Sequence, residues 1–583
     1  MKKCIFCAAL IWLVGGIDTQ AQVKEKVWFD GLARSFFARD AVGPHEYGDS
    51  LSAQNVSNGY NLLDLNTHIN PIEDFEVFAQ LRIRNTFGGF FGSGTSVDVR
   101  QLRASGVIND KVRFSVGDLF LEQSRFTLHN WDEEMSWGQE YMENAYRDIR
   151  VYENFYVDNR WRLQGLQTDF SFAFDRFIRT LEFDGFITRP RGSSLISGSL
   201  YSSDLLLGGG TVRSVINPNL IWEANYINLF EIPTSGTTNI SLRNPVYHTA
   251  LWGKKKKGNI LVEPKIEAGF SGRHWVYTEL AGDIQDSTSV NTQGMFLEFQ
   301  TGVIRQDSSF MIEVGYRYVD ANFRSAGTQS RRIDFGPGNT PTVFPTYTND
   351  MLPRPITVFD LMTDENIYNQ ELSATLMTFN PAFSNILPFG DATPNRQGAY
   401  FKAKAGKSKQ VLSGQLEGGY FQEVIGQGTL NKRTFALAKA ALHANLSNSF
   451  AWKRKAQVSL VSQSESTHRA SEDIDQVSLF SHQLSAKANL EVVPKLSCQF
   501  AFRWLQVTGN EFYTVRDSQG EIINFMLTDF DQQSQVLSAG LLYQLSDKVY
   551  ANLQFNGWGA SFDDELYPTF NYRRLLFVIS AQL

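Results

Sequence analysis

The chain of 583 residues has little of what stabilises many secreted proteins or carries a chain through a membrane as helices. It contains only three cysteines and 17 prolines, and its net charge is −7. So few prolines argue against an unstructured, proline-rich chain, and the acidic balance argues against a nucleic-acid-binding protein, which normally has a basic surface. After the first 21 residues, no apolar run reaches about 18 residues, the length that a membrane-spanning helix needs. The remaining classes are a large soluble β-rich protein and a β-barrel of an outer membrane.

The first residues have the composition of a secretory signal peptide. Two lysines follow Met1, residues 5–14 form a short apolar core, and Thr19 and Ala21 are small residues at positions −3 and −1 of a cleavage site. We therefore expect residues 1–21 to be a signal peptide and the mature chain to be exported.

Cys4 and Cys7 raise the alternative of a lipoprotein. They lie before or within the apolar core of the leader, where a lipid-attachment cysteine would not be, so we favour cleavage before Gln22. Cleavage leaves Cys498 as the only cysteine, and the mature chain can then form no internal disulfide. Packing or closed pairing of strands must stabilise it instead.

Most of the chain alternates between apolar and polar residues with a period of two. Such alternation is typical of a β-strand with one apolar and one polar face, because successive side chains point to opposite sides. The alternation is clearest over residues 75–84, 310–318, 484–492 and 549–558.

A soluble β-sandwich would show the same alternation, but three features favour a membrane barrel. The expected strands are about 9–13 residues long, against five or six in soluble sheets, and a tilted membrane-spanning strand needs about 9–11. Aromatic residues near strand ends, such as Phe310 and Tyr318, suit the girdles at membrane interfaces. Short and long connections also alternate, as periplasmic turns and external loops do. The long ones are expected near residues 40–58, 122–158, 325–394, 508–532 and 559–568.

The end of the chain adds a resemblance. Residues 574–583 form an amphipathic strand whose apolar face ends on Leu583. This resembles the C-terminal signal of outer-membrane barrels, although that signal commonly ends in Phe. With the Ala21-Gln22 junction, the aromatic-rich final strand resembles Gram-negative, Bacteroidota-type outer-membrane barrel proteins that are porin-like, without a motif of any subfamily.

We expect an all-β fold, a transmembrane antiparallel β-barrel of about 22 strands, with about 18 or 20 as alternatives. Strand patterning begins at Val27, so residues 22–583 would form one barrel domain with no separate plug domain. The long extracellular loops at 122–158 and 325–394 would fold partly into the lumen and narrow it, because long loops are commonly functional. Simple external loops are the alternative. Over residues 97–108 the alternation changes phase, which a β-bulge would explain.

The strand phase also places a set of charged side chains on the polar face, toward the lumen. Both signs occur, so we expect a path for polar solutes without strong ion selectivity. The alternative is a ladder of salt bridges that stiffens the wall. The lumen-lining candidates are Glu76, Arg82, Arg84, Glu313, Arg317, Glu417, Lys487, Glu491 and Arg503.

The sequence shows no motif for catalysis or metal binding. Its eight histidines are scattered, and it has neither an HExxH helix motif nor a GxSxG nucleophile elbow. A pair at the barrel rim, such as His274 with Asp283, stays open from sequence alone. We expect no enzyme activity, no catalytic or metal-binding residue and no cofactor.

The sequence therefore predicts a channel of the cell outer membrane that passes small polar solutes. Its expected partners are outer-membrane lipid and such a solute, and not nucleic acid. The rival is a non-conducting barrel that serves as a structural or assembly partner in an envelope complex for secretion, export or motility. A lesser alternative is an adhesin or receptor that uses the 325–394 loop.

Overall fold

The fold is taken from a computed structural model of the chain. It describes residues 26–42, 54–87, 94–129, 161–232, 241–328 and 386–583, with short gaps at 176, 193–194, 198–199, 202–203, 282–283, 388–389, 407–410, 427–428, 450–451, 472–475, 517–521 and 563–568. The predicted signal peptide and most of the two long loops, residues 130–158 and 329–385, lie outside the described residues.

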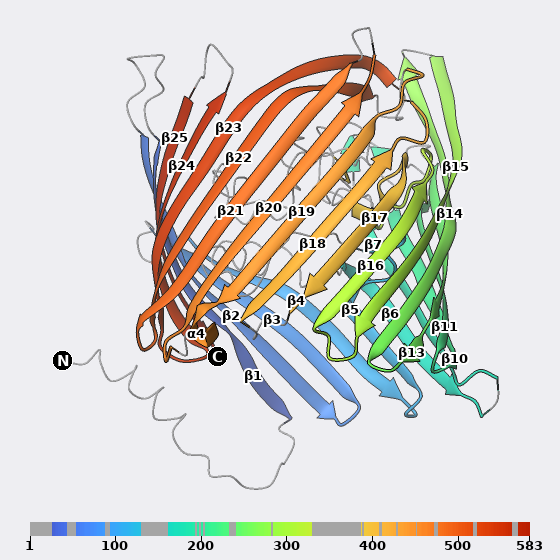
Figure 1. Cartoon of the computed structure of the whole chain (residues 1–583). Helices are drawn as coiled ribbons and strands as arrows, with labels where there is room; N and C mark the ends of the chain where they lie inside the picture. Colours follow the sequence, from blue (N-terminus) through green and yellow to red (C-terminus); the bar gives the residue numbers. More distant parts are fainter. Residues whose placement is uncertain are drawn as a thin grey trace.

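One antiparallel sheet closes on itself and forms a barrel (Figure 1). The sheet has 23 strands. Two of them, β12 and β13, pair with successive parts of one neighbouring strand, β14, and together fill one position of the wall, so the wall has 22 strands. The first strand, β1 (Val27–Val42), pairs with the last, β25 (Thr569–Gln582), over eleven rungs. This pairing confirms the expected closure of the barrel. The 22 strands of the wall confirm the expected number.

The other wall strands follow in chain order, and each pairs with the next, except that β12 and β13 both pair with β14. In the described part of the chain, no helix is long and apolar enough to cross a bilayer. A small hairpin of β8 (Leu195–Ser197) and β9 (Leu200–Tyr201), the 3-10 helix η4 (Gly390–Ala392) and the short helix α4 (Leu446–Ser449) lie outside the wall. The wall strands between the first and the last are β2 (Gln54–Ile72), β3 (Phe75–Thr86), β4 (Thr95–Ile108), β5 (Val112–Leu121), β6 (Trp161–Ala173), β7 (Thr180–Arg191), β10 (Asp204–Asn217), β11 (Leu220–Ile232), β12 (Ser241–Gly253), β13 (Lys255–Lys257), β14 (Ile260–Ala281), β15 (Ile284–Arg305), β16 (Phe310–Val319), β17 (Arg396–Ala405), β18 (Leu412–Gln422), β19 (Thr434–Asn445), β20 (Ala456–Arg469), β21 (Val477–Val493), β22 (Leu496–Arg516), β23 (Ile522–Gln544) and β24 (Val549–Phe562).

The two faces of the wall differ because side chains alternate along each strand. In β25, Leu575, Phe577 and Ile579 are exposed, whereas Leu576 and Val578 between them are buried. Exposed apolar side chains recur on the same, outer face of the neighbouring strands, as Leu553 and Phe555 do in β24. The barrel thus has an apolar outer surface and a largely covered inner one.

Two details of the strand pairing bear on the sequence predictions. The register of β3 against β4 shifts between Gln101 and Val99 and leaves Arg100 as an extra residue, which confirms the expected bulge. The expected long loop at 508–532 is wrong, because β22 and β23 continue through it and leave only residues 517–521 between them. A backbone ladder needs no apolar face, so polar residues on these strands, such as the exposed Asp529, do not end the pairing.

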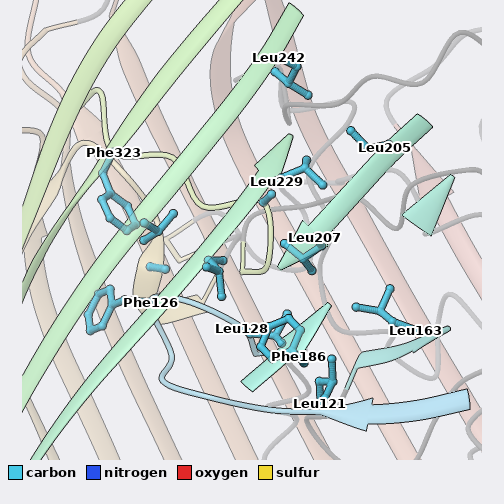
Figure 2. Close-up of a cluster of buried hydrophobic side chains, with 14 of the residues drawn as sticks. Leu121, Phe126, Leu128, Leu163, Phe186, Leu205, Leu207, Leu229, Leu242 and Phe323 are labelled. Atoms are coloured by element: carbon cyan, nitrogen blue, oxygen red, sulfur yellow. The ribbon is translucent and has the colours of Figure 1, made fainter. Parts of the chain in front are cut away.

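The inner face of one half of the barrel carries a cluster of buried apolar side chains (Figure 2). Most of its members come from wall strands between β5 and β16. Phe126, Leu128, Phe323, Ala326 and Ala392 come from the described ends of the two long loops. These loop ends therefore pack on the inner face, where burial of apolar surface stabilises them.

Candidate functional site

The first loop segment, residues 122–129, leaves the end of β5 and lies along the inner face of the wall; we call it the strap. The backbone N of Gln123 donates to the carbonyl O of Leu128 at 2.7 Å, which closes the strap on itself. The Phe126 ring stacks on Phe296 of β15 with 4.0 Å between ring centroids. The strap therefore leaves the wall at β5 and is attached to β15, on the far side of the apolar cluster from β5.

The second segment, residues 320–328, follows β16 and lies beside the strap. Gly294 of β15 leaves room for it, since a Cβ there would lie 2.1 Å from the backbone N of Phe323. Leu128 and Gly327 form an isolated parallel β-bridge, and the Ser325 hydroxyl donates to the carbonyl O of Thr127 at 2.9 Å. Two loops far apart in sequence are thus joined by backbone contacts inside the barrel.

A network of charges fixes the strap to the wall. Arg125 of the strap donates to Glu267 of β14 at 3.0 Å and to Glu298 of β15 at 3.3 Å. It also pairs at 2.5 Å with Asp391 of η4, 266 residues away in the chain. A single guanidinium group thus joins both long loops to two neighbouring wall strands.

Arg317 of β16 completes the network from the wall. It pairs with Glu298 at 2.9 Å and with Asp391 at 2.8 Å, and its guanidinium lies over the Tyr400 ring. The Tyr400 hydroxyl of β17 donates to Glu298. Charge-assisted hydrogen bonds of this kind are stronger than neutral ones, and burial strengthens them further.

The charge state of the loop members follows from these contacts. Burial alone would raise the pKa of Asp391, but the guanidinium groups of Arg317 and Arg125 outweigh it and hold the pKa well below its ordinary value. Burial would likewise lower the pKa of Arg125, and the carboxylates of Glu298, Asp391 and Glu267 more than reverse this. Both groups are therefore charged at neutral pH.

We expect the attachment of the loops to be insensitive to pH near neutrality. Because the pKa of Asp391 is lowered by folding, its stabilising contribution is complete above the ordinary value of about 4 and is lost as the pH falls below that value. Single-channel conductance should therefore be constant between about pH 8 and pH 5, and should become larger and noisier only below about pH 4. A titratable step in conductance near pH 6 would contradict this assignment.

Beside the strap, an open cavity of about 1070 Å³ is lined by residues of the strap and of the neighbouring wall strands. The strap reaches it directly, since Gln123 donates to the Thr211 hydroxyl of β10 at 3.2 Å. A volume of this order is typical of sites that admit small molecules. The charged members of its lining are Asp110, Lys111, Arg113, Glu122, Asp169, Glu182, Asp184, Arg213 and Glu223.

Polar contacts within the cavity leave its charges partly open to solvent. Arg113 pairs with Asp169 at 2.7 Å, yet its side chain is 69% exposed. Arg213 lies 3.8 Å from Glu182, and both side chains are 45% exposed. Gln167 donates to Asp184 at 2.6 Å. The cavity is therefore a charged space accessible to solvent rather than a closed core.

The sequence-predicted lumen residues fall into four groups around the wall, on β3, on β16, on β18 and on the adjacent strands β21 and β22. The four arginines among them are buried, and the five other residues are half-buried. The buried residues are Arg82, Arg84, Arg317 and Arg503; the half-buried ones are Glu76, Glu313, Glu417, Lys487 and Glu491.

Several of these residues have well-defined partners in the wall. Arg82 pairs with the fully buried Asp64 at 2.7 Å, and Glu76 contacts His68 at 2.7 Å. Glu491 accepts hydrogen bonds from the backbone N of Lys455 at 2.9 Å and of Lys495 at 3.0 Å, so it lies by a turn at the strand end. Arg82, like Arg317, therefore takes part in an ion pair of the inner surface.

Sequence reasoning missed the residues that attach the loops, namely Arg125, Asp391, Glu267 and Glu298. The two wall residues carried a signal, because in β15 Glu298 alternates with Leu297 and Phe299 as a polar-face residue. The two loop residues carried none, since a loop has no periodicity. In the described part of the chain, no group of three or more His, Cys, Asp or Glu side chains could hold a metal ion.

These features define a closed antiparallel barrel with an apolar exterior and a charged, partly filled interior. No protein-family model and no curated protein matches the chain. Among solved structures it is similar to Pseudomonas aeruginosa OccK8 (OprE), at 11% identity and a TM-score of 0.33, over 95% of this chain and 98% of that one. It is also similar to P. aeruginosa OpdQ, at 10% identity and a TM-score of 0.34, over 96% and 97% of the two chains.

A third similar structure is P. aeruginosa OccK2 (OpdF) in complex with glucuronate, at 7% identity and a TM-score of 0.30, over 95% of this chain and 98% of that one. Likenesses at these TM-scores carry no argument about activity. The barrel is established by the strand pairing of the chain itself.

Proposed function

We propose that the protein is an outer-membrane channel that passes small polar solutes through a lumen narrowed by its two long loops. A closed barrel leaves no unpaired edge between its first and last strands, and closure is one of the two ways in which a backbone can cross hydrocarbon. The apolar side chains on its outer face suit contact with outer-membrane lipid. Export through the predicted signal peptide over residues 1–21 would deliver it there.

The observation that carries the proposal is the charged, solvent-accessible cavity beside the strap. A wall of 22 strands encloses more space than its own side chains can fill. The strap and the segment 320–328 occupy part of that space, and the cavity remains beside them, lined by exposed charged groups. A polar solute can exchange its hydration shell for such groups without a large desolvation cost.

The nine lumen candidates enter the proposal in three roles. Glu76, Glu313, Glu417, Lys487 and Glu491, which are half-buried, would contact solutes and ions. Arg82 and Arg317 would shape the path by holding buried carboxylates in place. Arg84 and Arg503 would add positive charge at the inner surface. The resemblance of the leader and the final strand to Bacteroidota-type proteins also remains part of the proposal.

Reconstitution tests the proposal directly. Folded, purified protein in planar bilayers should give stepwise conductance, and proteoliposomes should swell in small polar solutes, including glucuronate, the compound in one of the similar structures. The same preparation denatured by heat serves as the control. If no conductance steps occur at any voltage and the proteoliposomes do not swell, the channel is ruled out and the non-conducting barrel is favoured.

A further inference from the structure

A run of four lysines, residues 254–257, lies at the end of the barrel where the chain ends (Figure 1). The run continues β12 as β13, turns at Gly258 with φ +59° and pairs with the start of β14; we call residues 254–263 the lysine hairpin. All four lysine side chains are exposed. The two long loops leave the opposite end of the barrel, because β5 and β16 run antiparallel to β13 around the wall. Since the short turns of bacterial barrels face the periplasm, the lysine hairpin lies at the periplasmic rim.

The strand register decides which way each lysine points. Trp252 pairs with Lys265 and Lys255 pairs with Val262 in one continuous register, so β13 prolongs β12 after a break opposite Pro264. Proline has no N–H to donate to the ladder, which explains the break. Residues directly opposite one another in an antiparallel pair lie on the same face, and successive residues alternate between faces. The four lysines therefore divide into two inward and two outward side chains.

The inward side of the hairpin is partly neutralised. Glu263 lies opposite Lys254 in this register and pairs with it at 3.3 Å. Glu263 also lies four residues before Glu267, which is buried on the inner face, so both carboxylates share that face. Lys256 has the same orientation as Lys254, two residues away.

The outward side of the hairpin has no carboxylate opposite its lysines. Lys255 lies opposite Val262, and Lys257 lies opposite Ile260. Ile260 belongs to the apolar outer face of β14, where Ile266 is also exposed. Two ammonium groups therefore stand at the lower edge of an apolar surface.

Neighbouring strands set the level of these lysines in a membrane. Arg305 of β15 pairs with Ile260 and so shares the outer face, where it lies 3.6 Å from Asp307. On the same face, Trp222 of β11 lies opposite Leu251 of β12. Tryptophan is enriched where hydrocarbon meets water. Lys255 follows Leu251 by four residues, or about 13 Å along the strand, which places it beyond the hydrocarbon and among the headgroups.

We propose that Lys255 and Lys257 bind the phosphate of an anionic phospholipid in the periplasmic leaflet, whose acyl chains lie against the apolar face of β14. A lysine stem can cover apolar surface while its ammonium group reaches a headgroup. Charge complementarity favours this occupant, because a chain of net charge −7 repels anionic lipid except where cations gather. The alternative is that the lysines only protect the free edge of β13 from pairing with another chain.

Lipid preference of the full chain tests the site. Native mass spectrometry follows the binding of palmitoyl-oleoyl phosphatidylglycerol and of the corresponding phosphatidylcholine to the detergent-solubilised protein. We expect the first phosphatidylglycerol to bind about thirtyfold more tightly than phosphatidylcholine, because each lysine near the lipid adds about fivefold. K255Q/K257Q should abolish this preference. The matched control is K254Q/K256Q, which removes the same charge from the inward side of the same hairpin and should keep the preference. Heat-modifiable mobility in gels confirms that each variant is folded.

The site rests on the membrane location proposed above but not on conduction, so the two can fail separately. Conductance in phosphatidylcholine bilayers should be unchanged in K255Q/K257Q, because both side chains lie outside the lumen. Glycerol 3-phosphate has the phosphate without acyl chains and should not displace the lipid; displacement would overturn a lipid site in favour of a free phosphate.

Two further results would overturn the proposal. An equal loss of preference in the two double variants would show that orientation does not matter. An unchanged preference in K255Q/K257Q would leave the lysines as edge protection, or as a site for the cell wall if purified peptidoglycan sacculi bind the unchanged protein and not this variant.

Discussion

Replacing Arg317 with methionine is expected to lower the free energy of unfolding by about 3–5 kcal/mol, the cost typical of removing one partner from a buried ion pair. The Arg317 side chain is 2% exposed and contacts two carboxylates, Glu298 and Asp391. Methionine fills most of the space but removes the guanidinium that contacts both carboxylates, so each is left with less compensating positive charge. Urea unfolding in lipid vesicles, followed by tryptophan fluorescence, measures the change.

The control for this variant is Arg113→Met. Arg113 also pairs with an aspartate at 2.7 Å, but its side chain is 69% exposed, so screening by water limits its contribution to about 0–1 kcal/mol. Equal losses in the two variants would show that the network around Arg317 is not buried as described.

Replacing Arg125 with alanine is expected to raise single-channel conductance and open-channel noise. Arg125 is the strap residue that reaches Glu267, Glu298 and Asp391 together. Losing its charge leaves three buried carboxylates less compensated and removes about 3 kcal/mol or more from the attached state of the loops, which shifts attachment by about a hundredfold. Planar-bilayer recordings at neutral pH measure the result.

The matched control is Arg305→Ala, whose guanidinium lies 3.6 Å from Asp307 in an exposed turn between β15 and β16. That variant should conduct as the unchanged protein does. An Arg125→Ala channel with unchanged conductance would show that the strap does not narrow the path, even if the protein conducts.

Strand-level features could be predicted from sequence because each depends on neighbours along the chain. The alternation over residues 75–84 and 549–558 predicted β3 and β24, and the change of phase over 97–108 predicted the bulge at Arg100. The same reasoning erred at 508–532, where polar composition indicated a loop but the backbone ladder of β22 and β23 continues. Composition indicates the surroundings that the side chains of a strand face, whereas backbone pairing determines where the strand ends.

The loop network could not be predicted, because its members meet only after the barrel has closed. Arg125 and Asp391 lie in segments without periodicity, and Glu298 resembles many other polar-face residues of the wall.

The amino-acid order alone predicted long amphipathic strands, about 22 in number with about 18 or 20 as alternatives, because a period of two in polarity is a local property. The folded chain decided which charges meet and where the loops attach. Those outcomes depend on distances between residues that the sequence separates by up to 266 positions. Only closure of the wall brings such residues within the few ångströms over which ion pairs and hydrogen bonds act.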